Sequence, residues 1–241
     1  ATVKTIEHLM AAVSALEIHN LIVELDGPEV PVMDGSSAPF ISLLSKGGVV
    51  RQERLLSFIE FMKPVTVSEN GRHVTIHPGS SFEVAYQIQY NHPVISRQSY
   101  HYRHSRRAFE REIARARTFG FLKDVQLLQA QGLAQGGSLE NAIVIGDDRI
   151  LNKQGLRFFD EFVRHKILDL IGDFSLLGMP ILGRVEAICS GHLLHAKLIK
   201  EILENKKAWR VVTIPDGTAA YVEKRKVYPS YQGVSLPLSS I

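Results

Sequence analysis

The sequence has little of what marks a secreted or membrane protein. Its 241 residues include one cysteine, Cys189, which excludes a disulfide within the chain and is typical of a reducing compartment. No apolar run reaches the length of a transmembrane helix, and the first residues lack the basic and apolar regions of a signal peptide. A formal net charge of only +3 permits an anionic ligand but does not require nucleic acid. We therefore expect a soluble cytoplasmic protein.

The rest of the composition is that of an ordinary globular chain, with 45% hydrophobic and 22% charged residues. Strand and helix patterns occur in separate groups, which favours the α+β class over a doubly wound sheet. We predict a buried strand at residues 20–25, a hairpin around Asn70 and Gly71, and an alternating strand at residues 82–90. The pattern changes near residues 51–56, which predicts two domains, 1–56 and 57–241.

Residues 158–173 read as one long helix with an apolar face. That face has 3.6-residue spacing and consists of Phe159, Phe162, Val163, Ile167, Leu170, Ile171 and Phe174. His165, Asp169 and Asp173 follow at i, i+4 and i+8 on an adjoining stripe. An imidazole and a carboxylate one turn apart can bind a single cation, and zinc favours this pair. The alternative is a surface histidine paired with an aspartate.

A second candidate segment lies near the N-terminus. Thr5 is predicted as the N-cap of a helix that extends to about Leu16, which places Glu7 and His8 in its first turn. His8 could be a further zinc ligand, and Glu7 could take a proton from the attacking water. Neighbours on a regular helix point about 100° apart, but they could face one cleft if the helix start is irregular or lies over the site. The alternative is a capping glutamate and a partly buried histidine.

A third candidate segment is 189–195, where His192 follows a glycine at the start of a predicted helix. A histidine near a carboxylate such as Asp173 keeps its proton and could act as a general acid. His195 lies one turn further along the helix. We interpret it as an ordinary residue of the helix face.

Together these segments resemble the UDP-3-O-acyl-N-acetylglucosamine deacetylase family, zinc hydrolases that catalyse the committed step of lipid A biosynthesis in bacteria. The matching segments keep their order and spacing from about Thr2 to Thr213; they are residues 5–9, 31–36, 117–121, 136–138, 160–169, 171–173 and 190–192. The resemblance implies two similar layered β-sheet/helix domains packed around a zinc cleft. Family members carry further residues before the first of these segments, so we expect the first domain to be incomplete here.

The resemblance also implies the metal ligands and the base. His8, His165 and Asp169 would bind Zn²⁺ and leave an open position for water and the substrate carbonyl. Two imidazoles and one carboxylate are an arrangement expected of a catalytic zinc site. Glu7 would be the general base.

Four further residues receive roles by the same resemblance. His192, oriented by Asp173, would protonate the leaving amine. Thr118 would donate a hydrogen bond to the tetrahedral oxyanion, which is electrostatic stabilisation of the transition state. Lys166 would be a cation that binds the substrate near its sugar or diphosphate.

The implied substrate is a UDP-linked acylated glucosamine, and we expect a monomer. An insert at residues 119–144 would form a hydrophobic passage for the fatty acyl chain, with Phe119, Gly137, Ser138 and Val144 as lining residues. Tyr90 would place its ring against the uridine. The residues after His192 differ from the usual family sequence, so His195 inherits no role.

A different class of function is a nucleic-acid-binding module. Basic residues with interleaved aromatics occur at residues 97–117, from Arg97 through Tyr100 and Tyr102 to Arg117. Glu110 and Glu112 interrupt the run, so we prefer a solvated helix face and expect no nucleic-acid partner.

Overall fold

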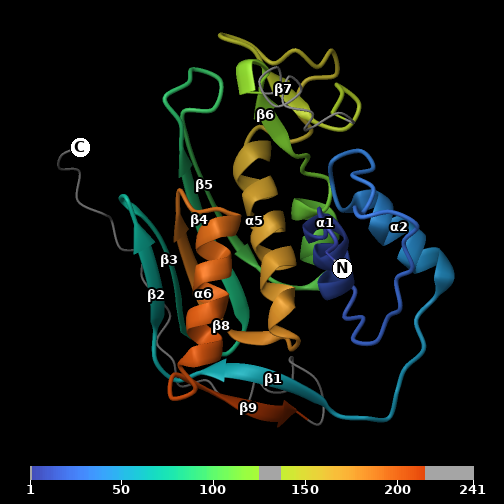
Figure 1. Ribbon diagram of the computed structural model, residues 1–241, viewed down its shortest axis with the longest axis vertical. Coiled ribbons are helices and arrows are strands. Elements are labelled where there is room, and N and C mark those ends of the chain that lie inside the picture. The colour runs from blue at the N-terminus through green and yellow to red at the C-terminus, as the bar shows by residue number, and fades with distance from the viewer. Residues whose placement is uncertain (1, 125–136, 215–241) are drawn as a thin grey trace.

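A seven-stranded mixed sheet forms the centre of the structure, a computed structural model that describes residues 2–124 and 137–214 (Figure 1). Its main path runs in the order β2 (Val65–Glu69), β3 (Arg72–Pro78), β8 (Ile181–Ile188), β1 (Leu56–Phe61) and β9 (Trp209–Ile214). Off this path, β4 (Phe82–Gln89) pairs with β8 and with β5 (Arg97–Arg103). The α+β class is therefore confirmed.

Strand β8 is the central strand of this sheet. Its first residues pair in parallel with β1, and the rest lies between antiparallel β3 and parallel β4. Val185 is in register with Ile76 on one side and with Val84 on the other, and all three are fully buried. Such apolar rows across strands make the sheet face on which the helices pack.

The predicted hairpin is confirmed. β2 and β3 pair from Val65↔Ile76 to Glu69↔Arg72. Asn70 and Gly71 between them have φ values of 51° and 73°. Asparagine and glycine adopt this left-handed region most easily, which is why the dipeptide predicts a tight hairpin.

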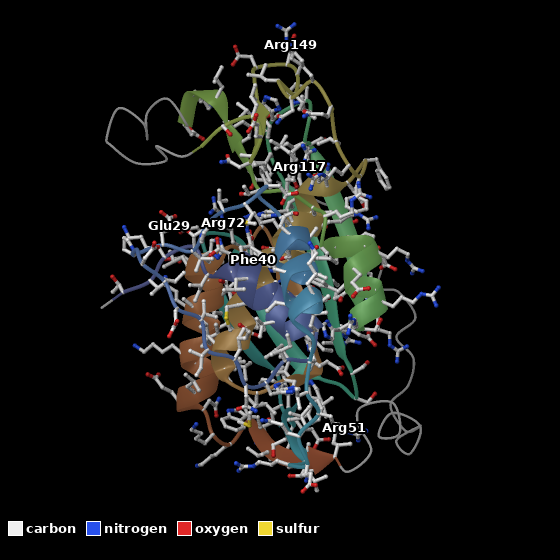
Figure 2. All side chains as sticks on the ribbon, turned by 90° about the vertical axis from the view of Figure 1, so that its right-hand side faces the viewer. Glu29, Phe40, Arg51, Arg72, Arg117 and Arg149 are labelled. Atoms are coloured by element: carbon white, nitrogen blue, oxygen red, sulfur yellow. The ribbon has the colours of Figure 1, made fainter. Side chains whose placement is uncertain are left out.

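Helices cover one face of the sheet. In Figure 1, α5 (Glu161–Phe174) and α6 (His192–Glu204) lie in front of the strands, α1 (Glu7–Ala15) lies beside α5, and α2 (Ala38–Gly47) lies outside α1. Ala11 and Ala15 of α1 join the main core, and their small side chains allow α1 to approach α5 closely. Phe40 of α2, labelled in Figure 2, belongs to the same buried cluster as Leu9 and Val13 of α1.

The remaining elements are short. The sequence pattern also predicts a helix from about residue 105 to 117, and the structure has a single turn there, α3 (Arg106–Ala108), continued by a π-helix at Phe109–Ile113. A small parallel pair, β6 (Phe119–Phe121) and β7 (Ile143–Ile145), lies near the N-terminal end of α5 (Figure 1). A second helix, which the sequence pattern predicts near residues 124–131, falls almost wholly outside the described residues. None of the described helices has the length and apolarity to cross a membrane.

The predicted strand at residues 20–25 is wrong. The segment forms no strand, and the side chains of Leu21, Ile22 and Val23 are 45%, 87% and 48% exposed. A strand needs a neighbour for its backbone hydrogen bonds, and none of the described strands pairs with this segment. Residues 2–55, before β1, contain α1, α2 and one isolated bridge between Lys4 and Glu29. The division into domains 1–56 and 57–241 stays a prediction.

Two details of the helix starts are also corrected. Thr5 has a φ of 57° and its hydroxyl donates to Glu29, so α1 begins at Glu7 with Ile6 as its N-cap. Phe159 is 86% exposed because α5 begins only at Glu161. Periodicity locates the helices well but does not determine their first residue.

Candidate active site

Three side chains from two helices converge at one point. His165 and Asp169 lie one turn apart on α5, and His8 comes from the first turn of α1. His165 Nε2 is 3.1 Å and His8 Nε2 is 3.7 Å from Oδ1 of Asp169. One nitrogen or oxygen of each residue lies within 4.8 Å of the others, and all three residues are at most 3% exposed. We call these residues the His/Asp cluster.

The cluster has the chemistry of a metal site. The Nδ1–H of His165 donates to the carbonyl oxygen of Ala116 at 3.1 Å, so in the neutral ring the Nε2 lone pair faces Asp169. Two acceptors 3.1 Å apart repel each other unless a cation or a proton lies between them. Among the described residues, Asp169 Oδ1 and His8 Nδ1 are buried without a hydrogen-bond partner. Ligand atoms around tetrahedral zinc are separated by about 3.3 Å, so these residues fit a zinc ion.

The protonation states also suit a metal. Burial, with a further contribution from His165, lowers the pKa of His8 to about 4. Burial opposes ionisation of Asp169, but His165 and Lys166 keep its pKa well below the ordinary value. At neutral pH the cluster therefore offers a neutral imidazole at His8 and a carboxylate at Asp169. These are the forms that bind a metal without first losing a proton.

A close helix contact determines where His8 lies. A Cβ atom built on Gly172 of α5 would be 2.1 Å from the backbone oxygen of Glu7, so only glycine allows α1 to approach this far. From the other side, the hydroxyl of Ser37 donates to the backbone oxygen of His8 at 2.7 Å. The start of α1 is thereby held over α5. This close approach explains how Glu7 and His8, which are neighbours on one helix, can both lie beside the cluster.

Replacing Gly172 with Ala is expected to push the start of α1 away from α5. Overpacking of this kind costs about 1–3 kcal/mol of unfolding free energy. Displacement of His8 should also weaken metal binding, because this ligand comes from the helix that moves. Zinc affinity and the thermal midpoint of the Gly172→Ala variant test this.

The matched control is Gly27→Ala, since a Cβ on Gly27 would meet no atom within 4 Å. We expect the control to bind zinc and melt like the original chain. A Gly172→Ala variant with unchanged zinc affinity and midpoint would show that the contact does not position His8.

Glu7 lies beside the cluster. Its Oε1 is 4.0 Å from Nε2 of His8, and its side chain is 20% exposed. Burial raises the pKa of Glu7, and the negative charge of Asp169 adds to this effect. A carboxylate with a raised pKa is a stronger base than one in water, and its partial exposure lets a substrate reach it.

His192 faces the cluster from the start of α6. Its Nδ1–H donates to Oδ2 of Asp173 at 2.8 Å, and its Nε2 lies 3.8 Å from Oδ2 of Asp169. The hydrogen bond that His192 donates to Asp173 raises the pKa of His192 to about 9. The side chain is 52% exposed. The structure thus brings a protonated imidazole to the open side of the cluster.

Lys166 is bound to the cluster itself. Its Nζ donates to Oδ2 of Asp169 at 2.9 Å and lies 5.7 Å from the ring centre of Phe119. Burial works against the charge, but Asp169 holds the pKa of Lys166 above its ordinary value. The Lys166 ammonium group therefore binds Oδ2 of Asp169, whereas Oδ1 faces His165.

Thr118 belongs to a segment anchored on α5. The neighbouring Arg117, labelled in Figure 2, is buried. It forms a two-point ion pair with Glu161, at 2.9 Å and 3.1 Å. The backbone N–H of Thr118 donates to the oxygen of Gly35 at 2.8 Å. Since Ala116 holds His165 in the same segment, residues 116–118 and the first turns of α5 form one hydrogen-bonded unit.

Aromatic side chains extend from the cluster toward β6. The ring of Phe119 lies 6.3 Å from His165 and 6.0 Å from Tyr90. Burial raises the pKa of Tyr90, so its hydroxyl stays protonated at neutral pH. The structure brings Tyr90 and Phe119, both named from the sequence, together beside the cluster.

The other three residues predicted to line the acyl passage are Gly137, Ser138 and Val144. Gly137 and Ser138 are exposed, and Ser138 bonds with Glu140 and Asn141 in its own turn. Val144 is buried and on the face of β7 opposite Ile145, because side chains alternate along a strand.

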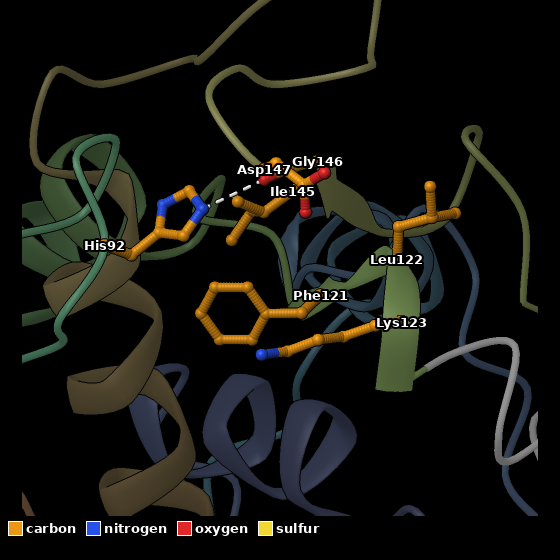
Figure 3. A pocket seen from close by; sticks show the side chains of 7 residues that line it. All are labelled: His92, Phe121, Leu122, Lys123, Ile145, Gly146 and Asp147. Carbon is orange, nitrogen blue, oxygen red and sulfur yellow. Dashed lines mark hydrogen bonds between the residues drawn. The ribbon is translucent and has the colours of Figure 1, made fainter.

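A cavity of about 240 Å³ lies beside β6 and β7 (Figure 3). It is lined by His92, Phe121, Leu122, Lys123, Ile145, Gly146 and Asp147. Nε2 of His92 donates to the backbone oxygen of Gly146, the residue that follows β7, at 2.9 Å. None of the four residues named for the acyl passage lines this cavity.

The basic run at residues 97–117 does not form a continuous binding stripe. Tyr102 is fully buried, and Arg117 is buried against Glu161. Arg106 pairs with Glu110 at 3.0 Å. These three side chains are therefore engaged within the fold and not available for stacking on bases or binding phosphates.

The interpretation of His195 as an ordinary helix-face residue is wrong. Its side chain has no exposed surface, and its Nδ1 lies 2.6 Å from Oδ2 of Asp173. The three-residue spacing between His192 and His195 was the feature of the sequence that could have predicted this contact. Residues three apart on a helix share a face, so a carboxylate that meets the first can also meet the second.

The chain is similar in sequence to one family of known proteins. The family model described as UDP-3-O-acyl N-acetylglycosamine deacetylase matches residues 1–204. The protein named UDP-3-O-acyl-N-acetylglucosamine deacetylase from Syntrophus aciditrophicus is 50% identical over 87% of this chain and 66% of its own length. Proteins of the same name from Syntrophotalea carbinolica (49%, over 88% and 68%) and Myxococcus xanthus (50%, over 87% and 67%) are similarly close. The chain spans about two thirds of the length of these relatives, and it belongs to the UDP-3-O-acyl-N-acetylglucosamine deacetylase family.

Proposed function

We propose that this chain is a zinc-dependent amide hydrolase. It would remove the N-acetyl group of UDP-3-O-(3-hydroxyacyl)-N-acetylglucosamine, giving the free amine and acetate, which is the committed step of lipid A biosynthesis. The observation that carries the proposal is the convergence of His8, His165 and Asp169 within 4.8 Å, with Glu7 alongside. These are the residue types of a catalytic zinc site.

We assign the zinc ligands as His8, His165 and Asp169. Zinc bound there would act as a Lewis acid that polarises the amide carbonyl and increases the acidity of water. The protein side of this site is already preorganised, because Ala116 orients the ring of His165 and Lys166 binds the outer oxygen of Asp169. Partners of this kind fix the ligand geometry in metal sites.

We assign the base to Glu7 and the acid to His192. Glu7 would accept a proton from the attacking water, and its raised pKa makes it a suitable acceptor. His192 would donate a proton to the leaving nitrogen from Nε2, since its Nδ1 is held by Asp173. Two titratable groups with separate environments can thus perform opposite proton transfers.

Thr118 and Lys166 complete the proposed machinery. The Thr118 hydroxyl would donate a hydrogen bond to the oxyanion of the tetrahedral intermediate, and hydrogen bonds to Gly35 and from His165 fix the backbone of residues 116–118. Lys166 would contribute positive charge both to Asp169 and to the bound sugar or diphosphate. Its ammonium carries three protons, and within residues 2–124 and 137–214 it donates one hydrogen bond, to Asp169.

For the substrate, we propose that Tyr90 contacts the uridine and that the acyl chain follows residues 119–144. Phe119 is the best supported lining residue because its ring lies beside His165. Gly137, Ser138 and Val144 are retained as lining candidates. A monomeric state and a cytoplasmic location are predictions that accompany this function.

The test is metal analysis coupled to an acetate-release assay on the chain as it stands. We expect one zinc per chain and acetate released from the acylated UDP-sugar in proportion to bound zinc. The matched control substrate is UDP-N-acetylglucosamine, which lacks the acyl chain and should react more slowly. Folded protein that binds zinc but releases no acetate from the acylated substrate would overturn the proposal for this chain.

A further inference from the structure

One carboxylate oxygen of Asp173 accepts hydrogen bonds from two histidines. The Nδ1–H groups of His192 and His195, both in the first turn of α6, donate to its Oδ2 at 2.8 Å and 2.6 Å. The two rings differ sharply in environment, since the side chain of His192 is 52% exposed and that of His195 is 0% exposed. Asp173 thus has one partner on the solvent side and one in the core.

The core side continues as a chain of hydrogen bonds into the sheet. Nε2 of His195 lies 2.9 Å from Oγ of Ser190, which lies 2.9 Å from the hydroxyl of Tyr86 on β4. The Tyr86 hydroxyl also donates to the backbone oxygen of Ser190 at 2.8 Å. Tyr86 and Ser190 are 1% and 9% exposed. Water therefore has little access with which to replace any of these bonds.

One arrangement of protons satisfies the whole chain. A carboxylate only accepts, so His195 carries a proton on Nδ1. Its Nε2 then accepts from the Ser190 hydroxyl, and the Tyr86 hydroxyl is shared between the two oxygens of Ser190. The bonds run in one direction, from the sheet through Ser190 and His195 to Asp173. Fully satisfied buried networks of this kind are rigid.

Packing holds the His195 ring as well. Its centre lies 6.3 Å from the ring of Tyr86 and 6.1 Å from that of Phe174, both nearly perpendicular to it. Both nitrogens are bonded and the neighbouring rings restrict rotation. The ring therefore offers its Nδ1–H to Asp173 in one fixed direction.

We infer that His195 is a positioning residue for the proton donor, an inference that rests on the proposed function. It holds the Asp173 carboxylate from the core side, so that Oδ2 meets Nδ1 of His192. This orients the His192 ring with Nε2 toward the His/Asp cluster, 3.8 Å from Asp169. Without His195, the carboxylate loses one of its two fixed partners and can rotate, and His192 loses a defined orientation.

The test separates hydrogen bonding from volume with three variants. His195→Phe keeps the bulk of the ring and removes both bonds. His195→Gln places an amide near the position of Nε2, and His195→Asn places one near Nδ1, where it can still donate to Asp173. Removing an outer partner of an active-site group typically costs about 10–100-fold in activity. We expect a loss of that size in kcat for Phe and Gln, with KM and zinc content unchanged, and recovery of most of it in Asn.

A second measurement does not depend on turnover. In ¹⁵N-histidine-labelled protein, the Nδ1 proton of His192 should give a resolved, strongly deshielded signal, identified by its absence in His192→Ala. We expect this signal to persist in His195→Asn and to broaden or move in His195→Phe and His195→Gln. If the chain shows no deacetylase activity, this signal still reports on the contact, so failure of the function and failure of the inference are distinguishable.

Two results would overturn the inference. One is a folded, zinc-loaded His195→Phe or His195→Gln with the original kcat and an unchanged His192 signal. The other is a His195→Asn variant that loses as much kcat as Gln does, because the bond to Asp173 would then not be what matters. Asparagine and glutamine are polar and no larger than histidine. The comparison of His195→Asn with His195→Gln therefore remains available if His195→Phe does not fold.

Discussion

Replacing Glu7 with Gln is expected to leave zinc bound and to lower turnover by about 10²–10⁴-fold, the usual contribution of a general base. The two side chains have nearly the same shape, so the contact between Gly172 and the backbone of residue 7 is preserved. An amide has no lone pair basic enough to accept a proton from water. Because Glu7 is not one of the three cluster residues, its loss removes the base and leaves the ligands in place.

The measurement is kcat for acetate release, with zinc content and thermal midpoint determined on the same preparation. Glu24→Gln is the matched control, since it makes the same change at an exposed carboxylate. Unchanged turnover in Glu7→Gln would reject Glu7 as the base. Lost zinc would instead indicate that Glu7 supports the ligands.

Replacing His165 with Ala is expected to abolish stoichiometric zinc binding, and with it activity. The substitution removes one of three ligands and also leaves the carbonyl of Ala116 without its donor. A metal that binds only the folded state, at about 1,000 times its Kd, adds about 4 kcal/mol to the unfolding free energy. For a chain of this length that corresponds to roughly 10 °C in thermal midpoint.

Zinc analysis and thermal melts with and without chelator check this. The original chain should lose stability when a chelator is added, whereas His165→Ala should melt at the same temperature in both conditions. His101→Ala is the control, because it removes an imidazole that is 60% exposed on β5. A His165→Ala variant that still binds one zinc per chain would refute the ligand assignment.

Part of the site could be read from local spacing. An α-helix fixes the positions of residues four apart, so the pairing of His165 with Asp169 follows from the helical pattern of residues 158–173 alone. The hairpin at Asn70 and Gly71 was predictable for a similar reason, since these two residues favour the backbone angles of a tight turn. Such features depend on a few neighbouring residues.

Other features depended on partners far away in the chain. An apolar pattern at residues 20–25 suggested a strand, but a strand exists only where a neighbour accepts its hydrogen bonds. His195 was interpreted as an ordinary helix-face residue because its burial depends on Tyr86, more than one hundred positions earlier. Phe159 looked like a core residue because the first residue of α5 was not fixed by its periodicity.

The sequence by itself determined the α+β class, the family resemblance and the residue types of the metal site, because these follow from composition, short-range periodicity and motif spacing. Only the tertiary structure decided that His8 meets His165 across more than 150 residues, and that Glu7 lies beside them. The physical reason is steric. Gly172 has no side chain, so the backbone of α1 can lie directly against α5, and the position of an entire helix depends on that contact.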